Sequence, residues 1–315
     1  MAVPQGNKEE KLNLDTLVLE DVTWVDIPLP TEKETDYLAQ HYPFHPLDLD
    51  DTLSRIQCPK IDEYKDYLFF VFHFPIYRKA ERVLTSSQLA VFISPKYLIT
   101  LHQGELKPLV KLFKECQIDE ESRQEYMGQG PAYLLYRILD RLVDYCLPIL
   151  NKVGEGIEEV EENIFSDRQK GTIREISRLR RDVIAFRRII WPMRAVIGRL
   201  EPMVRQFTDI ALPVYFGDMV DHLDRIWDGL DEYKEVVEGL SDTYDSLATN
   251  RTNEVVRILT IIATIMLPVT VVAGIYGMNI ELPFMHSDYA LLYVFLIMLT
   301  VIIAILLFLR RIKVI

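Results

Sequence analysis

Two long runs without charged residues lie near the C-terminus of the sequence. The first run covers positions 258–280 and the second covers positions 289–309. Each is long enough to cross about 30 Å of hydrocarbon as an α-helix. Arginines precede the first run, and arginines and a lysine follow the second, so the positive-inside bias places both chain ends in the cytoplasm. The pattern predicts a membrane-spanning helical hairpin with an external loop at 281–288.

The N-terminal third contains apolar, β-branched and aromatic runs of the kind that form strands. These predicted strands are 17–27, 67–77 and 88–103. Residues 45–55 instead predict a helix, because Pro46 and acids stand in its first turn. Residues 104–116 predict another, because they repeat apolar positions at helical spacing. We therefore predict a cytoplasmic α/β domain over residues 1–125.

Helical periodicity then continues to the first uncharged run. Residues 126–212 predict an antiparallel helical pair with a turn near 166–172. No proline occurs between Pro213 and Pro268, so residues 213–280 predict one stalk helix that continues into the first membrane span. Residues 289–315 predict the second span and a basic cytoplasmic tail.

The charge distribution separates the two parts of the chain. Residues after Arg257 sum to +1, so the part up to Arg257 carries −13, against −12 for the whole chain. An acidic body attracts cations and repels nucleic acid, so no nucleic-acid partner is expected. The three cysteines have no metal-type spacing, and the polar N-terminus has no signal-peptide pattern. We therefore expect an inner-membrane protein whose bulk is cytoplasmic.

Residues at a spacing of three or four mark one face of the stalk helix, as in a parallel bundle. The polar or small positions on this seam include Asn253, Thr270 and Gly274, and the apolar positions are Val256, Leu259 and Leu267. A purely structural coiled coil favours branched apolar residues throughout. Rings of polar and apolar residues in alternation suit the lining of an ion pore.

The first span ends in the sequence Gly277-Met278-Asn279, which a short loop and one last helix follow. In this position, and with the preceding segment 252–276, the chain resembles the CorA family of magnesium and divalent metal-ion transporters. Further similar segments lie at 23–27, 133–144, 189–194 and 215–222, so the resemblance covers nearly the whole chain. It implies a funnel-shaped homopentamer in the lipid membrane, with the first spans around the pore.

The chemistry of the ion supports a selectivity filter at this motif. Mg²⁺ holds its water shell tightly, so a filter recognises the hydrated ion with oxygen acceptors such as the Asn279 carbonyls. Gly277 would let the helix end in a conformation that a Cβ resists, and Met278 would pack beneath the loop. Glu281 matches an acidic loop position in the family and would concentrate cations.

Regulation by cytoplasmic Mg²⁺ is also implied by the resemblance. Asp218 and Asp221 match carboxylates that bind Mg²⁺ between subunits of the family. Arg78 and Lys79 stand where relatives carry an acid, and a cation there could pair with Asp218 instead of a metal.

The sequence contains no GxxxxGK[ST], HExxH, GxSxG or CxxC motif, so we expect no enzymatic activity. A divalent-cation channel for Mg²⁺, with Co²⁺ or Ni²⁺ as further ions, is the function predicted. One alternative is a zinc transporter of the same fold, with or without proton coupling; His222 is the histidine considered for zinc. The other is a non-conducting membrane scaffold.

Overall fold

The computed structural model describes residues 12–54, 58–78, 81–165, 171–208, 210, 212–278 and 289–311. The chain divides into two compact units, residues 1–241 and 242–315. The helix α8 (Pro213–Tyr276) contributes residues to both units. The predicted fold class, an α/β domain followed by long helices and two apolar C-terminal helices, is confirmed.

The first unit is built on a six-stranded sheet with the strand order β1-β2-β6-β5-β4-β3. The strands are β1 (Asp15–Leu19), β2 (Val22–Pro28), β3 (Lys60–Glu63), β4 (Leu68–Arg78), β5 (Val83–Ile93) and β6 (Tyr97–His102). β2 and β6 run parallel, and all other neighbours are antiparallel. β4 is apolar and buried along nearly its whole length. A strand without polar alternation is typical of a sheet that is covered on both faces.

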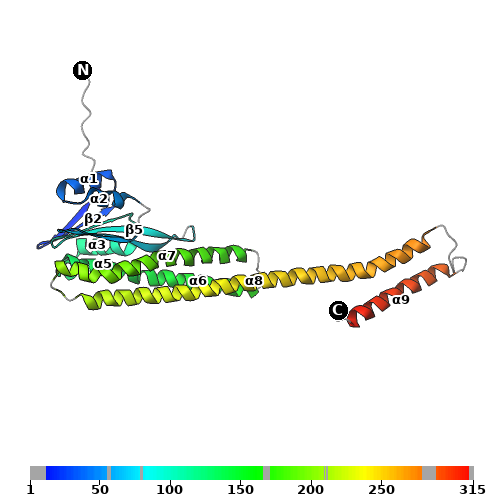
Figure 1. The fold of residues 1–315 in the computed structure, drawn as a ribbon. Coiled ribbons are helices and arrows are strands. Elements are labelled where there is room, and N and C mark those ends of the chain that lie inside the picture. The colour runs from blue at the N-terminus through cyan, green and yellow to red at the C-terminus, as the bar shows by residue number, and fades with distance from the viewer. Residues whose placement is uncertain are drawn as a thin grey trace, which may run out of the picture. The chain divides into compact units, whose positions relative to one another are not determined.

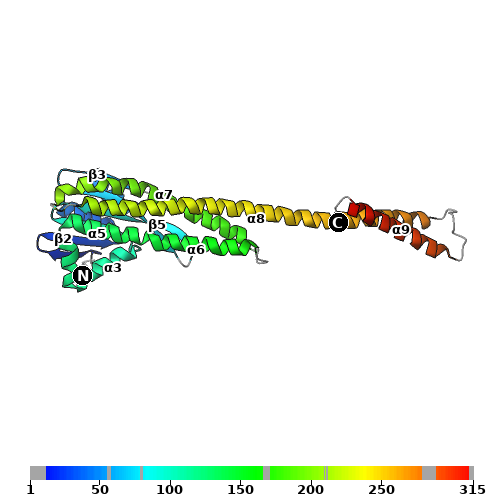
Figure 2. The ribbon, with the colours of Figure 1, turned by 90° about the horizontal axis from the view of Figure 1, so that it is seen from below.

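Helices cover both faces of this sheet, as Figure 1 shows. On one face lie α1 (Glu32–His41) and α2 (Pro46–Leu53), packed over a core that includes Leu38, Phe69 and Phe92. On the other lie α3 (Lys107–Ile118), α4 (Glu120–Met127), α5 (Pro131–Asp144), α6 (Cys146–Phe165) and α7 (Thr172–Val204). Within this unit α6, α7 and the first part of α8 run side by side (Figure 2).

A buried series of polar groups fastens the parallel strands β2 and β6 together. The Trp24 indole donates to Thr100 Oγ1 at 3.1 Å, and Thr100 donates to Asp26 Oδ1 at 2.6 Å. The amide of Gly104 donates to His102 Nδ1 at 2.9 Å. The proton of the imidazole therefore sits on Nε2, 3.2 Å from Asp26 Oδ1. Each side chain of this series thus has a hydrogen-bond partner, and His102 has a structural role.

Two of the three predicted strands are in fact hairpins. The run 17–27 contains β1 and β2, which are joined at Glu20 with a φ of 51°. The run 88–103 contains parts of β5 and β6, which are joined by a turn that includes Pro95. The first turn lacks the glycine or asparagine that usually marks a tight hairpin, so the sequence pattern did not reveal it.

The helical region after residue 130 begins with two helices instead of one. α5 ends at Asp144, and α6 starts at Cys146 and carries Pro148 in its first turn. Proline has no amide proton for the carbonyl of Asp144, so a continuous helix would lose a hydrogen bond there. A short 3₁₀ helix, η1 (Arg205–Phe207), follows α7. The predicted turn at 166–172 lies mostly outside the described residues.

The predicted long helix is confirmed. α8 is 64 residues long and continues through Pro268. In the first unit its buried side chains recur every three, four or seven residues: Phe216, Met219, Leu223, Ile226, Leu230, Val237 and Leu240. This spacing places one apolar stripe against the rest of the unit.

The second unit contains the end of α8 and the helix α9 (Ala290–Arg311). Both helices contain stretches long and apolar enough to cross a membrane, and these stretches are not buried within the chain. A core helix of a soluble protein would be covered by protein, whereas helices whose apolar side chains have no protein cover suit lipid. Residues 279–288, between them, lie outside the described residues.

Gly130 provides a test of the backbone geometry before α5. Its φ of 94° and ψ of 172° belong to a region that essentially only glycine adopts. We expect Gly130→Ala to destabilise the first unit by about 1–3 kcal/mol, measured as a lower midpoint of thermal unfolding. Gly198→Ala is the matched control. This glycine is exposed within α7 and a Cβ there would meet nothing within 4 Å, so the midpoint should not fall. Equal effects of the two substitutions would contradict the assignment.

Candidate ion-conduction site and acidic cluster

The seam residues predicted to line a pore all lie on α8 and are exposed in the single chain. Val256, Leu259 and Leu267 have exposed fractions of 54%, 65% and 67%. Asn253, Thr270 and Gly274 are exposed as well. Large apolar side chains at regular spacing and without cover mark a surface that packs against protein or lipid. The seam is therefore available to meet copies of itself.

Threonine hydroxyls on this helix donate their protons to backbone oxygens of the same helix. Thr270 Oγ1 donates to the Met266 carbonyl at 2.8 Å, and Thr260 Oγ1 donates to the Val256 carbonyl at 2.8 Å. A hydroxyl whose proton is used in this way keeps only its lone pairs for other partners. Such a hydroxyl oxygen can accept a hydrogen bond from the water shell of a cation. Its own proton points to the backbone carbonyl and so does not repel the cation.

The predicted filter begins where α8 ends. Gly277 and Met278 follow the helix; the Gly277 amide donates to the Ala273 carbonyl at 3.0 Å, and 53% of Met278 is exposed. Gly277 does not have a positive φ, so a left-handed backbone is not what would resist a Cβ at this position. The restriction is instead a close approach, since a Cβ here would lie 3.1 Å from the Ala273 carbonyl oxygen. Asn279 and Glu281 lie outside the described residues.

In the first unit, Asp218 belongs to a cluster of acids around one imidazole. His222 Nδ1 lies 3.2 Å from Asp144 Oδ1, and His222 Nε2 lies 3.8 Å from Asp218 Oδ2. α5 and α8 thus bring together groups that are far apart in the sequence. Imidazole and carboxylate are suitable ligands for divalent metals. The imidazole contacts Asp144 and Asp218, so the histidine considered for zinc lies between two carboxylates.

Asp140 and Asp144 were not among the site residues predicted from the sequence. Both lie on α5 four residues apart, which puts them on one helix face, and this spacing was the signal available. Burial raises the pKa of the Asp140 carboxyl, and the neighbouring Asp144 charge raises it further. A cation bound here would reduce the repulsion between these carboxylates.

Among the described residues, the contacts of His222 with acids involve Asp144 and Asp218 and not the other predicted members of the site. Asp221 is exposed. Arg78 donates to Glu105 in its own chain at 2.9 Å, a partner that the sequence analysis did not anticipate. Pairing of Arg78 with Asp218 from another copy stays a prediction, and Lys79 lies outside the described residues.

One further acidic group, Asp48, Asp51 and Asp62, has oxygens within 4.8 Å of one another. The Lys60 ammonium contacts both Asp51 and Asp62, and the Tyr67 hydroxyl donates to Asp48 at 2.9 Å. The Lys60 ammonium already holds two of these carboxylates and a tyrosine hydroxyl holds the third, so we assign the group a structural role.

Comparison with known proteins identifies the class of this molecule. Residues 20–311 match the family described as CorA-like Mg²⁺ transporter protein. The cobalt/magnesium transport protein CorA of Thermotoga maritima is 32% identical over 260 residues, which cover 82% of this chain and 73% of that protein. The CorA of Methanocaldococcus jannaschii is 25% identical over 281 residues, which cover 89% of this chain and 87% of that protein.

The fold agrees with this result. The complete structure of the Methanocaldococcus jannaschii CorA magnesium transporter superimposes with a TM-score of 0.78 and 23% identity, covering 95% of this chain and 93% of that chain. The family match places the chain among membrane transporters and not among enzymes. The chain belongs to the CorA-like Mg²⁺ transporter family, as the resemblance had indicated.

The raised pKa of Asp140 gives a prediction for stability. In the presence of EDTA at pH 7.5, we expect Asp140→Asn to unfold at a higher temperature than the wild type, because folding disfavours the charged carboxyl. The gap should shrink as the pH falls through the raised pKa towards the unfolded value of about 3.9, because the wild-type carboxyl is then protonated in both states.

Differential scanning fluorimetry at several pH values measures this effect. Asp221→Asn, at an exposed position of α8, is the control and should behave like the wild type. A wild type that is more stable than Asp140→Asn at pH 7.5 would rule out a destabilising charge at Asp140.

Proposed function

We propose that the protein is a homopentameric channel that conducts hydrated Mg²⁺, and also Co²⁺ and Ni²⁺, across the inner membrane. The observation that carries this proposal is the exposed seam of α8, on which apolar residues alternate with polar groups. A scaffold has no need of Asn253 or Thr270 at such positions, since apolar residues would pack better there. A ring of five such helices would enclose a polar path.

Asn279 would be the selective element at the outer end of this path. Five amide oxygens can accept hydrogen bonds from the water shell of Mg²⁺ without removing it. The Met278 amide donates to the Ile275 carbonyl, three residues back in place of four, which supports an end of the helix directly before Asn279. Met278 offers no hard oxygen and would serve packing, and Glu281 would raise the local cation concentration.

Along the remaining path, polar and apolar rings would have different tasks. Thr270 and Asn253 would contact the hydrated ion. Gly274 has no side chain, so the pore would be wider at that position. The side chains of Val256, Leu259 and Leu267 would form constrictions that stop conduction by excluding water. In this arrangement both chain ends are cytoplasmic, as the arginines before the first span and after the second favour.

Cytoplasmic Mg²⁺ would also regulate the channel at Asp218. The concentration of acids from α5 and α8 supports a cation-binding role, and Asp221 would contribute from the same helix. A bound divalent cation offsets carboxylate repulsion, so its loss would let the acidic segments separate.

Zinc transport is the second candidate. His222 between Asp144 and Asp218 favours it, because imidazole binds Zn²⁺ better than Mg²⁺. Fluxes of Mg²⁺, Co²⁺, Ni²⁺ and Zn²⁺ into proteoliposomes, with and without a pH gradient, separate the two. Zinc flux that exceeds magnesium flux, or that requires the gradient, would replace our proposal.

Asn279→Ala is expected to reduce Mg²⁺ flux by at least about tenfold, because five acceptors for the hydrated ion are lost. Assembly should be unchanged by size-exclusion chromatography. Thr300→Ala, on α9, is the control and should keep wild-type flux. Wild-type flux in the Asn279→Ala channel would contradict the filter assignment.

A hexaammine metal complex, which resembles hydrated Mg²⁺ in size and donor geometry, should block Mg²⁺ flux when it is applied outside. The block should weaken in Asn279→Ala channels that retain measurable flux. Absence of block at saturating complex would indicate a filter that removes water from the ion.

Asp218→Asn is expected to weaken the protection from limited proteolysis that Mg²⁺ gives, because one ligand charge of the regulatory site is removed. Glu159→Gln, at an exposed acid of α6, is the control. Equal Mg²⁺ dependence in wild type and Asp218→Asn would remove Asp218 from regulation.

A further inference from the structure

The helix α3 has a second face that the fold does not use. Its core face consists of Leu109, Leu112, Phe113 and Cys116, which are all buried. The opposite side carries Lys107, Val110, Lys111, Lys114 and Ile118 at spacings of three, four or seven residues. Ile118 is 86% exposed, the highest value among the exposed large apolar side chains of the described residues.

This face borders a groove between α3 and the start of α4. The groove has a volume of about 470 Å³ and is lined by Gly104, Lys107, Val110, Lys111, Lys114, Glu115, Ile118, Asp119 and Ser122. We call these nine residues the α3 groove. It lies wholly within the first unit and contains none of the predicted pore or regulatory residues.

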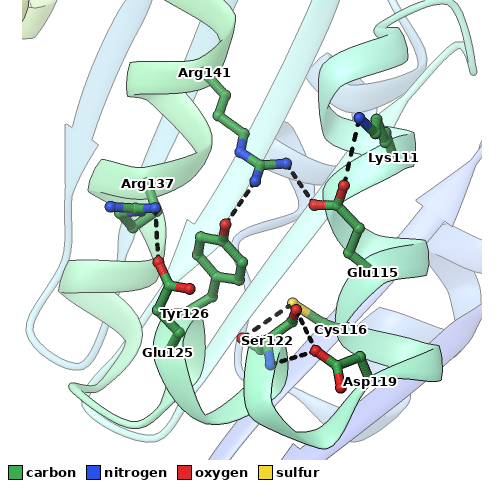
Figure 3. A network of polar contacts seen from close by, with 9 residues as sticks. All are labelled: Lys111, Glu115, Cys116, Asp119, Ser122, Glu125, Tyr126, Arg137 and Arg141. Carbon is green, nitrogen blue, oxygen red and sulfur yellow. Dashed lines mark hydrogen bonds and ion pairs between the residues drawn. The ribbon is translucent and has the colours of Figure 1, made fainter.

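The two carboxylates of the α3 groove are engaged within the protein (Figure 3). Glu115 accepts a hydrogen bond from Arg141 at 2.7 Å, and this guanidinium also donates to the Tyr126 hydroxyl at 2.6 Å. Asp119 accepts from the amide and hydroxyl of Ser122 at 2.9 and 2.6 Å and thereby caps α4. These bonds lower the pKa of both carboxyls, so they remain ionised and occupied.

The lysines of the α3 groove, in contrast, have few partners within the described part of the protein. Among the described residues, Lys107 and Lys114 have no carboxylate partner, and Lys111 is 77% exposed with Glu115 at 3.6 Å. A second molecule that docks here therefore meets the ammonium groups of Lys107 and Lys114, which have no carboxylate partner in the described part of the chain, and that of Lys111, which shares Glu115 with Arg141, above the apolar side chains of the groove. On a chain with a net charge of −12, such a surface selects for an anionic partner through charge complementarity.

We infer that the α3 groove binds an acidic amphipathic helix of another protein. Apolar side chains of that helix cover Val110 and Ile118, and its acids, spaced by three or four residues, pair with Lys107, Lys111 and Lys114. The 12 residues of α3 extend over about 18 Å, which sets the length of contact at three to four turns of the partner.

The shape of the groove favours a helix over the other occupants. A small-molecule pocket encloses most of its ligand, whereas Ile118 projects almost fully into solvent. The regular spacing of the lysines along a single helix matches the spacing of side chains on a second helix. A second copy of this chain would have to offer a free acidic amphipathic helix, and the acidic helix α6 already buries its apolar residues Ile157 and Val160.

The experiment uses the full-length protein in nanodiscs of zwitterionic lipid and a fluorescent 18-residue peptide. The peptide has leucine at heptad positions a and d and glutamate at e and g; a second peptide has lysine at e and g. Fluorescence anisotropy should show binding of the glutamate peptide, with an affinity that falls as NaCl rises. The lysine peptide should bind at least about tenfold more weakly.

Two variants and one control locate the contact. The Lys111→Glu/Lys114→Glu protein should bind the glutamate peptide at least about tenfold more weakly, and so should Ile118→Ser, whose exposed position spares the fold. Lys65→Glu/Lys96→Glu makes the same charge change at exposed positions of the same unit and should bind like the wild type. Carbodiimide cross-links should join the peptide to the lysines of the α3 groove.

Equal affinity in the groove variants and the control, or equal binding of both peptides, would overturn the proposal. Cross-links from the groove lysines to another copy, formed without peptide, would assign the surface to self-association. Displacement of the peptide by a short-chain alkyl phosphate below its micellar concentration, with no such displacement by an unlabelled glutamate peptide, would assign it to a small anionic amphiphile.

Discussion

The demand for backbone hydrogen bonds in hydrocarbon determines the C-terminal part of this protein. A chain that enters lipid has no water to satisfy its amides, so the two apolar segments have to be helical. α8 meets this demand without a break between its aqueous part and its apolar part. One helix therefore carries an apolar stripe for the first unit, the exposed seam that we propose for self-association and, at its end, the start of the proposed filter.

Much of this organisation was readable from sequence because it depends on long, regular patterns. Two uncharged runs, and the absence of proline between Pro213 and Pro268, predicted α8 and α9. Short features were harder to predict from the sequence. The turn at Glu20 has no glycine, and the break at Tyr145 depends on Pro148, which lies beyond it in the chain. In both places the local pattern was weaker than the apolar periodicity around it.

The candidate site likewise has one part that follows from a sequence pattern and one part that follows only from the fold. The seam on α8 follows from spacing along one helix, and its residues are exposed as a lining would require. The acidic cluster depends on tertiary packing, since Asp144 and His222 meet only when α5 lies against α8. Arg78 pairs with the carboxylate of Glu105 because the fold brings the two residues together. No spacing in the sequence indicated this pair.

The threonines and the proline of α8 also have a mechanical consequence. Pro268 leaves the carbonyl of Thr264 without its amide donor, and nearby carbonyls share their lone pairs with the hydroxyls of Thr260, Thr264 and Thr270. A helix bends most easily where its ladder of backbone bonds is interrupted or shared. The segment of α8 that crosses the membrane therefore has a lower bending stiffness than an uninterrupted helix would have, so an applied torque would curve it more easily.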